Sequence, residues 1–121
     1  QLPGLDIEDG IKKTNNSEIL YNEVLKEFLD AYGNSAETFA ILVEEQRYEQ
    51  LKMLLLDLKG LTSSIGAYSM FKLSDEVFKL IIFNKKHLLT GFVKSYKEKL
   101  EELSYSINQY TMKKWLILSS L

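Results

Sequence analysis

Apolar residues recur at three- and four-residue spacing through most of this chain, and that period is typical of amphipathic helices. Residues 2–6 precede the pattern as an extended lead-in, and Asp6 is placed to cap a short helical turn that reaches Gly10. Longer helices are predicted over about residues 17–32, 35–46, 49–64 and 67–83, and from 87 past 107. Because short connections between long amphipathic helices favour antiparallel packing, we predict an all-α antiparallel four-helix bundle with an additional short N-terminal helix.

The helix predicted over residues 49–64 has two apolar residues on its polar side. At about 100° per residue, one face is an apolar stripe that we assign to the core: Leu51, Leu54, Leu55, Leu58, Thr62 and Ile65. The opposite face contains Lys52, Met53, Leu56, Asp57, Lys59, Gly60 and Ser63. Leu56 lies about 160° and Met53 about 140° from the centre of the stripe, so both are expected to point toward solvent.

Gly60 is the third unusual residue on this face. A glycine inside an exposed helix costs about 1 kcal/mol relative to alanine. The close approach of a partner would explain its presence beside Leu56 and Met53. A chance pair of surface apolar residues with a tolerated glycine is the alternative explanation.

Composition narrows the classes of function. The 121 residues predict one domain over 1–121, with 45% apolar and 26% charged residues, as in ordinary globular proteins. A net charge of −2 with scattered basic residues argues against nucleic-acid binding. The absence of cysteine excludes disulfides and thiolate metal sites, and it fits a reducing, cytoplasmic compartment. No apolar run approaches the roughly 20 residues of a membrane span, so this segment is not expected to insert into a membrane. Since the chain starts at Gln1 rather than Met, we expect a fragment of a larger protein.

Patterns of catalytic residues are missing from the sequence. It contains no glycine-rich phosphate loop, no metal-ligand spacing and no Ser/His/Asp set, so neither a cofactor, a metal nor a conventional enzymatic activity is expected. The aromatic residues of the second half are expected in the core or at its edge: Phe71, Phe78, Phe83, Phe92 and Tyr96. The run from Trp115 to Leu118 fits a packed helix end, a partner-binding segment or a join to another domain.

One segment of the third long helix resembles a known family. Residues 56–61, Leu-Asp-Leu-Lys-Gly-Leu, followed by Ile65-Gly66-Ala67, are similar to the histidine-phosphotransfer (HPt) pattern His-x-x-Lys-Gly-Ser/Thr and its hydrophobic-Gly-Ala turn. The opening, Leu2-Pro3-Gly4-Leu5-Asp6, also resembles that family, and the similarity extends over about residues 2–105. It implies a four-helix bundle of a two-component phosphorelay that binds a response-regulator receiver domain, with sensor-kinase domains as possible neighbours in the same protein. In the family the lysine helps to neutralise the phosphoryl group, and the glycine keeps the surface open for the receiver.

The chain departs from this pattern at the phosphoacceptor position. Leu56 occupies the position of the histidine, and Leu61 occupies the Ser/Thr position. An alkyl side chain has no lone pair and cannot accept a phosphoryl group. The only histidine, His87, is predicted at a solvated helix start, and Asp57 points about 100° away from Leu56, so neither is expected to substitute.

Three hypotheses remain for the function. The first is a degenerate HPt domain that binds a receiver through Lys52, Met53, Leu56, Lys59, Gly60 and Ser63 without carrying phosphate. The second is an active relay protein whose histidine is missing only in this version of the chain. The third is a helical scaffolding or dimerisation module.

Overall fold

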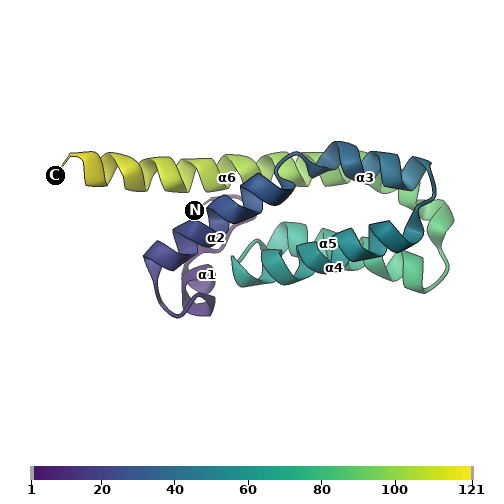
Figure 1. Cartoon of the computed structure of the whole chain (residues 1–121), viewed down its shortest axis with the longest axis horizontal. Coiled ribbons are helices and arrows are strands. Elements are labelled where there is room, and N and C mark those ends of the chain that lie inside the picture. The colour runs from purple at the N-terminus through teal and green to yellow at the C-terminus, as the bar shows by residue number, and fades with distance from the viewer. Residues whose placement is uncertain (1, 121) are drawn as a thin grey trace.

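The fold was obtained as a computed structural model that describes residues 2–120; within α6, nothing is described of the side chains of 114, 115 and 117–119. The described residues form helices, turns and one isolated bridge between Leu2 and Leu5, which confirms the prediction of an all-helical chain. The helices follow one another along the chain as shown in Figure 1: α1 (Ile7–Lys13), α2 (Glu18–Tyr32), α3 (Ser35–Glu44), α4 (Tyr48–Ser64), α5 (Tyr68–Ile82), the 3₁₀ helix η1 (Lys86–Phe92) and α6 (Val93–Ser119).

Side-chain caps begin the first two helices. The Asp6 Oδ1 accepts a hydrogen bond of 3.0 Å from the backbone N–H of Asp9 at the start of α1, as the sequence predicted. Ser17 plays the same part for α2, where its Oγ accepts from the N–H of Leu20 at 3.1 Å. Gly33 ends α2 in a right-handed conformation, and α3 starts two residues later, so the two helices run toward the same end of the molecule (Figure 1).

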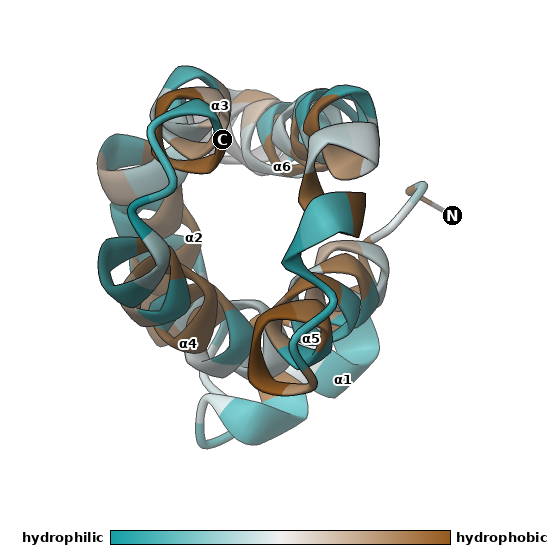
Figure 2. Ribbon diagram, turned by 90° about the vertical axis from the view of Figure 1, so that its right-hand side faces the viewer, coloured by the Kyte–Doolittle hydropathy of each residue, from teal (hydrophilic) through white to brown (hydrophobic). Residues whose placement is uncertain are grey.

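Four helices surround the core. The α4–α5 pair has the most extensive contact, α3 contacts both α4 and α6, and α5 contacts α6, so the four close a ring that Figure 2 shows end-on. The stripe predicted for α4 is buried or half-buried throughout, which confirms its assignment to the core. In the α3–α6 contact the rings of Phe39 and Tyr96 stack with centroids 4.2 Å apart and an interplanar angle of 7°.

The start of the last helix differs from the prediction. Residues 86–92 form a 3₁₀ helix, and α6 begins only at Val93. In a 3₁₀ helix residues three apart lie on the same side, and here that geometry turns both Leu89 and Phe92 toward the core. Gly91 between them is a poor α-helix former.

Of the aromatic residues expected in the core or at its edge, Phe83 lies outside it. Phe83 is exposed because it follows the last residue of α5, where the backbone leaves the core-facing direction. Leu20, which has helical spacing with the core residues of α2, is also exposed, because its neighbour Tyr21 takes the inward position.

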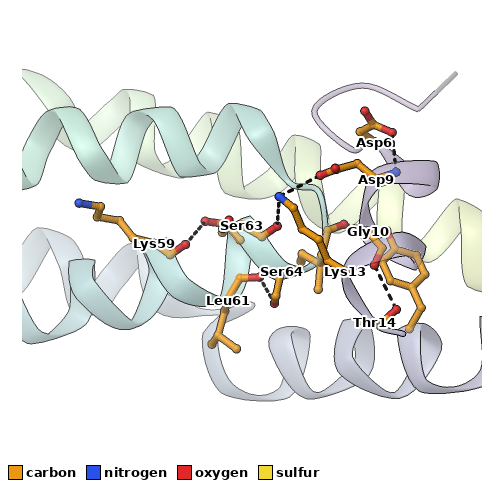
Figure 3. A network of polar contacts seen from close by, with 12 residues as sticks. Asp6, Asp9, Gly10, Lys13, Thr14, Lys59, Leu61, Ser63 and Ser64 are labelled. Carbon is orange, nitrogen blue, oxygen red and sulfur yellow. Dashed lines mark hydrogen bonds and ion pairs between the residues drawn. The ribbon is translucent and has the colours of Figure 1, made fainter. Parts of the chain in front are cut away.

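The lead-in and α1 dock on the turn that connects α4 to α5. The Asp6 N–H donates to the Gly66 carbonyl at 2.8 Å, and the Tyr21 hydroxyl donates to the buried Ile65 carbonyl at 2.8 Å. Gly66 has φ +76°, and a Cβ there would collide with the Asp6 carbonyl oxygen. Figure 3 shows Lys13 reaching from α1 to the Ser63 carbonyl, a contact of 3.1 Å. These contacts fix the C-terminal end of α4 relative to the rest of the chain.

Candidate functional site

The outward face of α4 carries the apolar pair that the sequence predicted. Leu56 stands at the middle of the 17-residue helix and is 51% exposed, and Met53, one turn earlier, is 67% exposed. Leu55 and Leu58 on either side of Leu56 are completely buried. The predicted orientation of Leu56 toward solvent is therefore confirmed.

Leu61, the second departure from the HPt pattern, has a different environment. Its side chain is partly buried and packs against the core cluster. Packing within the chain thus accounts for an apolar residue at position 61, whereas it does not account for the exposed half of the Leu56 side chain.

Gly60 leaves the surface beside Leu56 open. It is exposed in the helix, and a Cβ added to it would meet no atom within 4 Å outside its own helical neighbourhood. Its φ is not in the left-handed region. Neither backbone conformation nor packing against the described residues requires glycine here, so none of these residues offsets its cost of about 1 kcal/mol to the helix.

Lys59 is turned toward the neighbouring helix α5. Its Nζ lies 2.9 Å from the Asp75 Oδ1 and 4.8 Å from the centroid of the Phe78 ring. Asp75 also binds the Lys79 Nζ at 2.9 Å through its other oxygen. The hydrogen bonds from Lys79 and Lys59 hold the pKa of the Asp75 carboxyl below its usual value. The lysine that the resemblance assigns to phosphoryl neutralisation is thus ion-paired with this chain's own carboxylate.

The remaining two predicted residues border the face. The Lys52 Nζ lies 3.0 Å from the Glu49 Oε1, and because Glu49 is 86% exposed this pair contributes little stability. Ser63 is half-buried, at the end where Lys13 binds its carbonyl. The six predicted residues therefore share one side of α4, and Leu56, Met53 and Gly60 form its open centre.

Tyr32 is a neighbour that the sequence pattern did not reveal. Its hydroxyl donates to the Asp57 Oδ2 at 3.2 Å and so ties α2 to α4. Burial, followed by the charge of Asp57, raises the pKa of Tyr32. Asp57 therefore faces α2, in agreement with its predicted direction away from Leu56. His87 is exposed in η1, as expected for a solvated residue. The pairing of Tyr32 with Asp57 depends on where the C-terminal end of α2 lies relative to α4, which residue spacing does not encode.

Among the described residues, the requirements of a metal site and of a membrane span are not met. Over residues 2–120 there is no cluster of three or more His, Asp or Glu side chains that could hold a metal ion. The described helices also include none with the length and apolar character needed to cross a membrane.

Comparison with known proteins identifies no relative. No protein-family model, no curated protein and no solved structure matches the chain.

Proposed function

We propose that this chain is a degenerate HPt-like domain that binds a response-regulator receiver domain through the outward face of α4 without accepting phosphate. The observation that carries the proposal is the half-exposed Leu56 at the centre of this face, where the resembled family has its histidine. Gly60, one turn further on, keeps the approach to Leu56 open. The Leu56 alkyl group has no lone pair with which to attack phosphorus, so position 56 can contact a receiver but cannot take up its phosphoryl group.

The arrangement of the helices supports the finer fold that this proposal requires. An HPt-like antiparallel bundle of α3, α4, α5 and α6, with α1 as the additional short helix, agrees with the ring of contacts among these four helices. The proposal also places the chain in the cytoplasm, as part of a larger signalling protein that contains sensor-kinase domains.

The apolar pair supplies a driving force for association. Burying a leucine side chain fully is worth about 1.5–3 kcal/mol. Leu56 is 51% exposed, so roughly half of that free energy remains to be gained when a partner covers it. Met53 adds a second apolar contact, and its flexible side chain adapts to the surface of a partner.

Substitution of Gly60 tests the proposal. Gly60→Arg places a long side chain in the open approach to Leu56, and its Cβ meets nothing within 4 Å. Gly91→Arg in η1 is a matched control, since a Cβ there also meets nothing within 4 Å. In titrations against a panel of receiver domains, we expect Gly60→Arg to weaken binding by about tenfold or more and Gly91→Arg to leave it unchanged. Equal binding by the wild type and both variants would remove this face from consideration.

A Leu56→His variant separates this proposal from an active relay. If the histidine is the only missing part, the variant takes up phosphate efficiently from a phosphorylated receiver. Poor uptake by a variant that still binds the receiver favours the non-carrying domain. Concentration-dependent self-association in sedimentation, with no receiver binding, would instead indicate a dimerisation module.

A further inference from the structure

The ion pair between Lys59 and Asp75 bears on what kind of receiver this face can bind. A lysine in this position is useful to a phosphorelay because its ammonium is available to a phosphoryl group. Here the Nζ is 2.9 Å from the Asp75 Oδ1, and both side chains are about three-quarters shielded, with exposures of 25% for Lys59 and 27% for Asp75. A shielded, charge-assisted hydrogen bond is stronger and less screened than one in solvent.

Phe78 adds to this arrangement, whereas Lys79 shares the carboxylate of Asp75. The Phe78 ring, 4.8 Å from the Lys59 Nζ, provides a cation–π contact that would be lost if the lysine swung toward a partner. Lys79 binds the second oxygen of Asp75, so the carboxylate is held in place from its own helix. Lys59 is therefore held on the α5 side of the face by the Asp75 carboxylate and the Phe78 ring.

Lys52, the other lysine of the face, does not take over the role of Lys59 as a cation for a phosphoryl group. Lys52 pairs with Glu49 at 3.0 Å, and the two charges cancel. The centre of the face is apolar, formed by Leu56 and Met53. A surface with an apolar centre, whose own two lysines each lie beside a carboxylate, gains more free energy from an apolar side chain of a partner than from an anion.

We infer, on the basis of the proposed function, that the receiver docks with an apolar side chain against Leu56 and Met53, and that its affinity does not depend on whether it is phosphorylated. Asp75 is the reason why the affinity is independent of phosphorylation. It is ion-paired with Lys59, the cation that would otherwise attract a phosphorylated receiver. The domain then holds a receiver in both of its states, whereas a relay protein exchanges a phosphoryl group with it.

The test uses a receiver that binds the wild type and is weakened by Gly60→Arg. Its dissociation constant is measured in Mg²⁺ with and without beryllofluoride, which forms a phosphoryl mimic on the receiver aspartate. For the wild type we expect the two constants to agree within about twofold, as for a surface whose charges are paired. In Asp75→Asn the carboxylate is lost and both Lys59 and Lys79 are released. The beryllofluoride form should then bind tighter on the order of fivefold, and this preference should decrease at high salt.

Glu76→Gln is the matched control. It removes one negative charge from the adjacent, exposed position of α5 and leaves the Lys59–Asp75 pair intact. We expect it to retain the wild-type indifference to beryllofluoride. Circular dichroism melts establish that all variants are folded.

The possible failures can be told apart. A wild-type preference for either receiver state of more than about tenfold overturns the inference, and so does an Asp75→Asn variant that remains indifferent. A failure of the proposed function would give a different result: Gly60→Arg would not change the affinity for any receiver.

Discussion

Replacement of glycine by alanine should change the free energy of unfolding in opposite directions at two positions only six residues apart, Gly60 and Gly66. Gly66 lies in the turn between α4 and α5 with φ +76°, and a Cβ there would collide with the Asp6 carbonyl oxygen. The left-handed conformation costs an L-residue about 1–2 kcal/mol. Relief of the collision moves Asp6, whose N–H donates to Gly66 and whose carbonyl accepts from Gly10 at 3.0 Å. With each hydrogen bond worth about 0.5–1.5 kcal/mol, we expect Gly66→Ala to reduce the free energy of unfolding by about 2–5 kcal/mol.

The same change at Gly60 should stabilise the protein. Gly60 is helical, has no left-handed φ and has open space where the Cβ would lie. Alanine removes backbone freedom from the unfolded chain and introduces no contact that must be relieved. We therefore expect Gly60→Ala to increase the free energy of unfolding by up to about 1 kcal/mol.

Urea denaturation followed by far-ultraviolet circular dichroism measures both effects. For a small domain a loss of about 3 kcal/mol lowers the urea midpoint by about 1–3 M, well outside experimental scatter. A Gly66→Ala variant within about 0.5 kcal/mol of the wild type would refute the docking of the lead-in on the α4–α5 turn. A destabilising Gly60→Ala would show that the glycine is required by the fold after all.

Two further predictions concern the contacts that hold α4 in place. Tyr21→Phe removes the donor of the 2.8 Å hydrogen bond to the buried Ile65 carbonyl, so we expect the free energy of unfolding to fall by about 1–3 kcal/mol in the same urea assay; an unchanged midpoint would contradict the bond. For Asp75, ion pairing lowers the folded-state pKa below the ordinary value of 3.8, so its contribution to stability is present above that pH and is lost as the pH falls through the folded pKa. Asp75→Asn should therefore be less stable than the wild type near neutral pH and equally stable at strongly acid pH, and a constant difference across the range would refute the linkage.

Periodicity predicted the parts of this structure that depend on one helix alone. The stripe of α4 and the outward direction of Leu56 follow from 3.6 residues per turn once the helix exists, because one face must meet the core. The cap at Asp6 was predictable for a similar reason, since it depends only on a neighbouring N–H.

Features that depend on two helices were not predictable in this way. The pairing of Lys59 with Asp75 requires the antiparallel register of α4 against α5. The hydrogen bond from Tyr32 to Asp57 requires the C-terminal end of α2 to lie beside α4. The 3₁₀ helix over Lys86–Phe92 is another such case, because Leu89 and Phe92 reach the core together only in a geometry that local propensity does not select.

Leu56 and Leu61 are both leucines in positions where the HPt pattern has polar residues, but only Leu56 supports the proposed docking surface. Leu61 packs against the core, so the fold alone accounts for it. Leu56 is half exposed on a helix beside Gly60, a glycine with no conformational or packing role within the described residues. A residue that costs helix stability and gains nothing among the described residues is what the proposed docking surface would explain. That argument depends on Gly60 more than on Leu56, because an exposed leucine is common on protein surfaces whereas an open glycine in mid-helix is costly.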